Sequence, residues 1–146
     1  MVRYPNDLVT DRRARNFAVA VTIATALASG YFAVVGLVNP GWLVPGGDTQ
    51  AAKTYASYVA ARGLVLAGAA LWFAAARAWR RLSLVLVLNG AVQVLDTVVG
   101  VVNGEVVKAV GPACFAIALF LAAAWLGRLA QPGRGAPAGQ RVDRDG

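Results

Sequence analysis

The stretch FAVAVTIATALASGYFAVVGLV, residues 17–38, decides the fold. Its 22 residues carry no charge, and as an α-helix they would extend about 33 Å at about 1.5 Å per residue. The hydrocarbon core of a bilayer is about 30 Å thick, so this run predicts a transmembrane helix. The apolar character persists beyond Ala28, where a cleaved signal peptide would turn polar. We therefore expect an uncleaved signal anchor.

Three further apolar stretches follow, and turn signals separate all of them. They cover about residues 57–79, 82–102 and 106–126. Asn39-Pro40-Gly41 ends the first helix, because proline disfavours helical geometry in the residue before it. A tight basic turn formed by Arg77, Arg80 and Arg81 and the segment Asn103-Gly104-Glu105 separate the later helices. The pattern predicts an all-α fold, an integral membrane four-helix bundle.

The chain divides into a basic N-terminal segment at residues 1–16, a four-helix transmembrane domain at 17–127 and a tail at 128–146. The tail is rich in Gly, Pro, Arg and Asp, and we expect it to be disordered because it cannot bury enough apolar surface. Of the 146 residues, 58% are hydrophobic and 14% are charged. In soluble domains about half of the residues are apolar and about a quarter are charged. There is room for one domain.

The net charge of +7 comes from basic residues that flank the apolar runs. Such flanks meet anionic headgroups, so we expect membrane lipids as partners and no nucleic acid. Lys53 and Lys108 are the only basic residues of the first and third loops and their margins. Four spans put those loops opposite the other segments, which predicts a cell-membrane protein with both termini cytoplasmic. The arginines on the predicted cytoplasmic side are Arg3, Arg12, Arg13, Arg15, Arg77, Arg80, Arg81, Arg128, Arg134, Arg141 and Arg144.

The sequence contains no histidine and a single cysteine, Cys114. This composition excludes intramolecular disulfides, Cys/His zinc sites and histidine-dependent catalytic triads. Phosphate-binding and dinucleotide-binding glycine motifs are also absent. We expect no metal and no cofactor, and we interpret Cys114 as a buried, inert packing residue.

Helix three carries a polar stripe with spacings of four, three, four and three, which fall on one helical face. Its members are Asn89, Gln93, Asp96, Gly100 and Asn103. A polar stripe on a Leu/Val helix must face the bundle interior or a wet cavity. In helix two, Arg62 follows Tyr58 by one turn. Arg62 is about 8 Å and Asp96 about 9 Å from the predicted outer ends of their helices, so we predict that they pair.

The polar residues also permit a purely structural interpretation. A buried ion pair can fix helix register without any chemistry, so Arg62 and Asp96 would then only lock two helices together. Lys108, near Glu105, would either extend to the headgroups or close the outer mouth of a polar pocket. Thr22, Thr25 and Ser29 form a hydroxyl stripe on helix one that either bonds to its own helix or touches a ligand. Gly111-Pro112 is typical of a kink.

The pattern resembles a family of small bacterial four-helix membrane proteins of unknown function, similar in plan to the DoxX-like proteins. The motifs that carry the resemblance are Gly36-Leu-Val-Asn-Pro40, Ala61-Arg62-Gly63-Leu64 with Gly68, Asn89-Gly90 with Asp96, and Gly111. The likeness covers about residues 17–127 and implies the fold more than an activity. Lys108 departs from the neutral or histidine-like residue expected there.

Two functions remain open, with a third less favoured. The chain would bind a lipophilic small molecule or act as an accessory membrane subunit, with Asn89, Gln93 and Lys108 as ligand-binding residues and with self-association as a further expectation. Alternatively, it would be a membrane-embedded isomerase, cyclase or epoxide-opening hydrolase. Asp96 would then be the acid or base, Arg62 its partner and Tyr58 a proton donor. Transport is less favoured, because one membrane acid in four short helices offers little for a conduction path.

Overall fold

The computed structural model describes residues 5–42 and 46–129 and is all-α in these segments. The helices are α1 (Pro5–Val38), α2 (Gln50–Ala75), α3 (Trp79–Val102) and α4 (Val106–Leu129), and a short 3₁₀ turn, η1 (Pro40–Trp42), follows α1. All four α-helices are long and apolar enough to cross a membrane. The predicted four-helix bundle is therefore confirmed. The tail expected to be disordered lies outside the described residues from position 130 onward.

The surface of the bundle suits a bilayer. Large apolar side chains point outward from every helix, among them Leu27, Val65, Leu95 and Ile117, which are 62–71% exposed. In water such a surface would be strongly unfavourable, at about 25 cal/mol per Å² of apolar area. In hydrocarbon it costs nothing, so the exposed side chains fit lipid contact.

All four helices are longer than their apolar runs predicted. The first begins at Pro5 rather than residue 17, and α2 begins at Gln50 rather than about residue 57. Thr49 caps α2, because its Oγ1 accepts the amide of Ala52 at 3.3 Å. Arg128 and Leu129, expected in the tail, belong to α4. The apolar run marks only the part of a helix that must lie in hydrocarbon, and the polar ends continue the helix beyond it.

The turn between α2 and α3 was also misplaced by the sequence prediction. Trp79, predicted at the end of helix two, is the first residue of α3. Arg80 and Arg81 follow it in the first turn of α3, so Arg77 alone of the three arginines remains in the connection. The physical reason is that α2 ends at Ala75 in a tight turn in which Arg77 takes a left-handed backbone conformation, with φ 53°.

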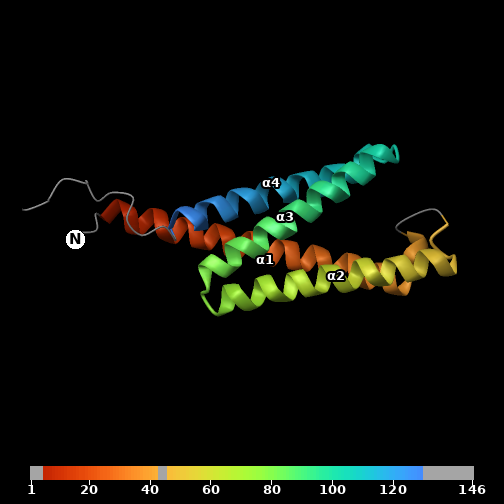
Figure 1. Cartoon of the computed structure of the whole chain (residues 1–146), viewed down its shortest axis with the longest axis horizontal. Coiled ribbons are helices and arrows are strands. Elements are labelled where there is room, and N and C mark those ends of the chain that lie inside the picture. The colour runs from red at the N-terminus through yellow and green to blue at the C-terminus, as the bar shows by residue number, and fades with distance from the viewer. Residues whose placement is uncertain (1–4, 43–45, 130–146) are drawn as a thin grey trace, which may run out of the picture.

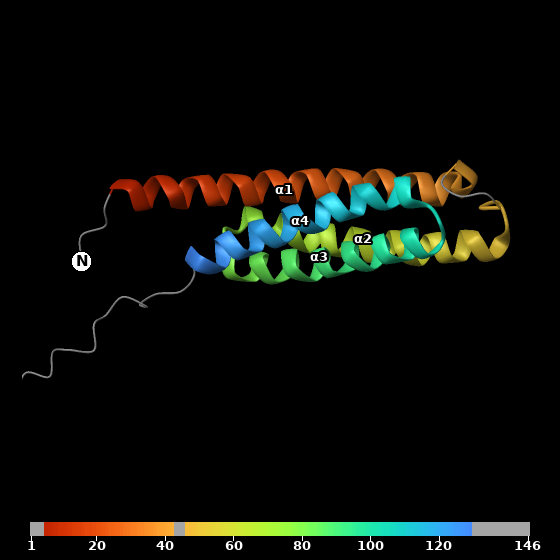
Figure 2. The same cartoon turned by 90° about the horizontal axis from the view of Figure 1, so that it is seen from above.

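The helices form two hairpins, α1 with α2 and α3 with α4, that meet at one end and diverge toward the other (Figure 1). The core lies where they meet, near the α2–α3 turn. Its buried members are Ala18, Val21, Ala70, Leu82, Val85, Leu86, Leu119, Ala122, Ala123 and Leu126. No residue of α3 beyond Gly90 is buried. Figure 2 shows that the α1–α2 hairpin also extends further than the α3–α4 hairpin at the divergent end.

Small residues hold the second hairpin together over most of its length. A Cβ added at Gly90 would lie 3.1 Å from the Phe120 ring, and one added at Gly100 would lie 3.1 Å from the Ala109 Cβ. Both glycines therefore let α3 and α4 approach closely, as small residues do in membrane helix pairs. The divergence consequently separates one hairpin from the other and does not open the α3–α4 pair.

Candidate functional site

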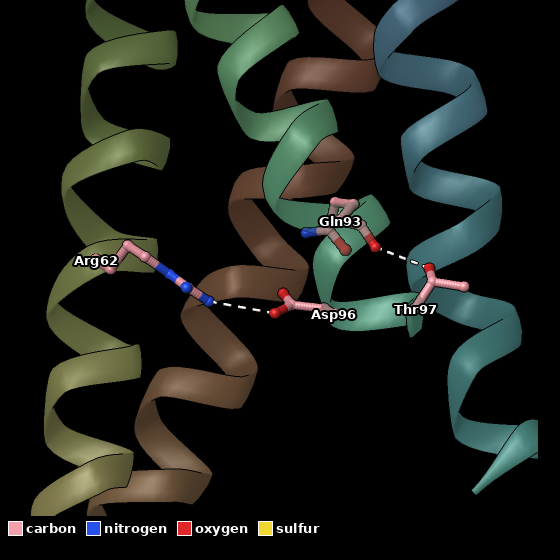
Figure 3. Close-up of polar contacts among 4 residues, drawn as sticks. All are labelled: Arg62, Gln93, Asp96 and Thr97. Carbon is pink, nitrogen blue, oxygen red and sulfur yellow. Dashed lines mark hydrogen bonds and ion pairs between the residues drawn. The ribbon is translucent and has the colours of Figure 1, made fainter. Parts of the chain in front are cut away.

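Arg62 on α2 and Asp96 on α3 form an ion pair across the two hairpins. The Arg62 Nη2 donates a hydrogen bond to the Asp96 Oδ1 at 3.3 Å. Figure 3 shows the long Arg62 side chain reaching from α2 to the carboxylate on α3. The predicted pairing is therefore confirmed. The pair links α2 to α3 in the region where the hairpins diverge.

Neighbouring side chains cover the pair only in part. The Arg62 side chain is 47% exposed and the Asp96 side chain 41% exposed. The pair is therefore less buried than the structural interpretation of a buried ion pair assumes, because the hairpins have already begun to separate at this level. Some other polar group is needed to cover the remaining charge if the surroundings are hydrocarbon.

The two residues reach the same level despite an error in the predicted depth. Since α2 begins at Gln50, Arg62 lies about 18 Å from the start of its helix rather than about 8 Å. Asp96 lies about 9 Å before Val102, where α3 ends, as predicted. The difference matches the greater reach of the α1–α2 hairpin in Figure 2. The charges are therefore level because the two hairpins are staggered.

The polar stripe on α3 changes its environment along the helix. Asn89 is buried, with 4% exposure, whereas Gln93 is half-buried one turn before Asp96 (Figure 3). Thr97 donates its hydroxyl to the Gln93 backbone carbonyl at 2.8 Å. Asn103 is exposed and bonds to its own helix. The stripe thus runs from the bundle interior at Asn89 out to the open end.

Two threonines of α1 lie in the interior of the bundle, with exposures of 1% for Thr22 and 3% for Thr25. Thr22 donates its Oγ1 to the Ala18 carbonyl at 2.8 Å, which is the back-bonding expected of a helical threonine. The Thr25 Oγ1 has no hydrogen-bond partner within the described segments. Ser29 instead faces Gly63 of α2, where a Cβ would lie 3.9 Å from the Ser29 Cβ.

The remaining predicted site residues do not join the pair. Tyr58 is 71% exposed. In the two segments that the structure describes, no hydrogen bond links Tyr58, Asn89 or Gln93 to the ion pair. Lys108 of α4 instead binds Glu105, which directly precedes that helix, with 2.6 Å between Nζ and Oε1. The structure therefore brings together two of the six candidates, and the catalytic or ligand-binding roles of all six stay predictions.

Two further expectations concern α4. Cys114 is exposed, so its interpretation as a buried packing residue is wrong. The residue belongs to the outward-facing side of α4, which a single apolar sequence run cannot distinguish from the inward side. Pro112 lies inside α4, which continues through it to Leu129.

No group of three metal-ligating side chains occurs in residues 5–42 and 46–129.

The fold defines a small polytopic membrane protein with four candidate spans. Comparisons with protein-family models, curated proteins and solved structures give no match to this chain. Of the resemblance to DoxX-like proteins, the structure therefore supports the four-span plan.

Proposed function

We propose that this protein binds a lipophilic small molecule inside the membrane, with the polar group of that molecule at Arg62 and Asp96. The observation that carries the proposal is an ion pair within two candidate spans whose side chains remain 47% and 41% exposed. A central arginine or aspartate costs about 2.5–3.5 kcal/mol in a membrane helix. Pairing recovers part of that cost, and a polar ligand group would recover more.

The chemistry of the pair selects the kind of ligand. The Arg62 guanidinium offers hydrogen-bond donors, and the Asp96 carboxylate offers acceptors. A hydroxyl or a carbonyl group can bond to one of the two without adding a net charge to the membrane interior. An isoprenoid alcohol or a similar amphiphile would satisfy both requirements, since it combines such a group with a long apolar body.

The surrounding helices supply apolar contacts for that body. Val59 and Val65 of α2 and Val99 of α3 lie within one turn of the charged residues, and all are more than half exposed. Because the hairpins diverge at this level, an elongated molecule could approach from the bilayer without unfolding any helix. Ligand sites between the helices of bundles follow the same pattern of apolar walls with few polar groups.

The proposal is tested by identifying what copurifies with the protein. Detergent-purified protein is extracted with organic solvent, and the bound lipophiles are quantified by mass spectrometry. The double variant Arg62→Leu/Asp96→Leu removes both charges together, so no unpaired charge remains. We expect a compound enriched in the parent protein and lost in this variant.

The control is the double variant Asp48→Asn/Lys53→Gln. It also neutralises one acid and one base, but at the start of α2. Asp48 lies in the connection that precedes α2, and Lys53 lies in the first turn of that helix. This control should retain the compound, and helical content by circular dichroism should be equal in all three proteins. Equal retention of the same compound by the Arg62/Asp96 variant would contradict the proposal.

A further inference from the structure

One end of the bundle gathers exposed arginines from separate elements. Its members are Arg15 of α1, Arg77 of the α2–α3 turn, Arg80 and Arg81 of α3, and Arg128 of α4; we call them the arginine cluster. All five are exposed. In Figure 1 this is the end where the hairpins meet, and both figures show it opposite the α1–α2 and α3–α4 connections. It is remote from Arg62 and Asp96.

Specific contacts bring the ends of these helices together. The Arg15 guanidinium carbon lies 5.5 Å from the centre of the Trp79 ring, which is a cation–π distance. The Phe17 and Trp125 rings, with centroids 5.1 Å apart, join α1 to α4. The Ser83 hydroxyl donates to the Ala123 carbonyl at 3.0 Å and joins α3 to α4. The elements that carry the five arginines therefore come together at one end of the bundle.

The charge of this surface is not balanced within the described chain. In residues 12–42 and 46–129, no carboxylate forms an ion pair with a member of the cluster. The acidic residue nearest in sequence is Asp11, four positions before Arg15. The five arginines outnumber this acid, so the bundle end carries an excess of positive charge. Mutual repulsion makes this arrangement unfavourable unless an anion lies on it.

The local backbone adds to the cost. Arg77 occupies a left-handed position, with φ 53°, that favours glycine. Arg80 and Arg81 lie in the first turn of α3, which has no acidic residue and no side-chain cap. The helix dipole disfavours cations at this position. An anion would relieve both the repulsion and the dipole conflict.

The residue type points to phosphate. Every basic residue other than Lys53 and Lys108 is arginine, and these two lysines lie in the first turns of α2 and α4, at the opposite end of the bundle. Topology signals use lysine and arginine alike, whereas arginine is the residue whose planar fork binds phosphate through two hydrogen bonds. Trp79 and Trp125 add amphipathic rings of the kind that lie at headgroup level.

We propose that the arginine cluster binds the phosphate headgroup of anionic phospholipids in the leaflet at this end, which the arginine distribution predicts to be cytoplasmic. This site is separate from the Arg62–Asp96 pair and would exist whether or not that pair binds a ligand. Arg77, Arg80 and Arg81 supply the main phosphate contacts, because they lie close together in sequence where the two hairpins are joined, Arg77 in the connection and Arg80 and Arg81 in the first turn of α3.

The test titrates detergent-purified full-length protein with phosphatidylglycerol and counts bound lipids by native mass spectrometry. Phosphatidylcholine and inorganic phosphate at equal ionic strength are the parallel ligands. In the variant Arg77→Gly/Arg80→Gln/Arg81→Gln the apparent phosphatidylglycerol affinity should fall about a hundredfold. Each arginine near a membrane surface contributes about a fivefold change, and the variant removes three of them. Glycine is used at position 77 because it adopts the left-handed backbone of the turn without steric cost, so this substitution should not impair folding.

The matched control is Arg134→Gln/Arg141→Gln/Arg144→Gln, which removes the same charge from the C-terminal segment and should change the affinity less than twofold. The variant Arg77→Lys/Arg80→Lys/Arg81→Lys keeps the charge and should bind about tenfold more weakly than the parent, because the two-bond contact is lost. Equal losses in the two charge-removing variants would overturn the proposal, as would equal binding of phosphatidylcholine. Full competition by inorganic phosphate would identify a free anion as the ligand and overturn the lipid assignment.

Discussion

Arg77 and Gly104 occupy the same position in two turns of one kind. In each turn the residue after the helix cap is left-handed, with φ 53° at Arg77 and 76° at Gly104. Both turns are Schellman motifs with paired backbone bonds of 2.8–3.1 Å. The bonds are Ala78 N to Phe73 O and Arg77 N to Ala74 O in the first turn, and Glu105 N to Gly100 O and Gly104 N to Val101 O in the second. One turn thus uses glycine, and the other places a long cation there.

Arg77→Gly should stabilise the protein by about 0.5–1 kcal/mol in a neutral detergent. The left-handed conformation costs a non-glycine residue about 1–2 kcal/mol, part of which is offset by the greater freedom of glycine in the unfolded chain. Thermal unfolding followed by circular dichroism measures the effect. The reciprocal variant Gly104→Ala should be destabilising by about 1 kcal/mol. A loss of stability in Arg77→Gly without anionic lipid would show that the arginine side chain itself holds the turn.

The sequence predicted the fold because long uncharged runs leave few alternatives. It also predicted the pairing of Arg62 with Asp96, since opposite charges in adjacent spans have few other partners. It did not predict the true start of α2 at Gln50, because polar residues at a membrane surface favour a helix or a loop about equally. The exposure of Cys114 was missed because a helix that is apolar on all sides has no polar face to show which side points outward.

The divergence of the hairpins could not be predicted either. It depends on where small residues meet across helices, as at Gly63 with Ser29 and at Gly100 with Ala109. Such contacts depend on the stagger between helices, which no single helix encodes. The candidate site was therefore found from its charges, whereas its partial exposure became evident only from the packing.

Single substitutions in the ion pair should destabilise the protein more than the double substitution. Arg62→Leu leaves Asp96 unpaired, at a cost of about 2.5–3.5 kcal/mol at the centre of a membrane helix, and partial exposure reduces this figure wherever water or headgroups reach the site. Arg62→Leu/Asp96→Leu leaves no unpaired charge and should lie within about 1 kcal/mol of the parent. The cycle compares the parent, Arg62→Leu, Asp96→Leu and the double variant. Chemical denaturation of these four proteins in mixed micelles gives the coupling energy between the two residues. Additive effects of the two single substitutions would show that the pair contributes nothing as a unit.

Gly90→Ala should be destabilising by about 1–2 kcal/mol, because the new Cβ would lie 3.1 Å from the Phe120 ring, and α3 and α4 would have to separate slightly. Gly68 is the matched control. A Cβ there meets no atom within 4 Å, so Gly68→Ala should be stabilising by up to about 1 kcal/mol through helix propensity. Thermal unfolding of both variants in the same detergent is the measurement. If Gly90→Ala and Gly68→Ala changed the stability in the same direction, the close α3–α4 contact would be contradicted.

The buried threonines of α1 permit a last comparison. Thr25 has an Oγ1 without a partner in the described segments, whereas the Thr22 Oγ1 bonds to the Ala18 carbonyl. Replacing an unsatisfied buried hydroxyl by a methyl group removes a desolvation penalty of about 1–3 kcal/mol. Thr25→Val should therefore be stabilising by about 1 kcal/mol or more in ligand-free protein, and Thr22→Val should be neutral or destabilising by about 1 kcal/mol. Unfolding of protein stripped of lipophiles by detergent exchange measures this difference. If Thr25→Val is destabilising after stripping, its hydroxyl has a partner in the folded protein. If instead the variant is stabilised when stripped but loses the copurifying compound, the Thr25 hydroxyl contributes to ligand binding, and the polar site extends from Asp96 into the bundle core.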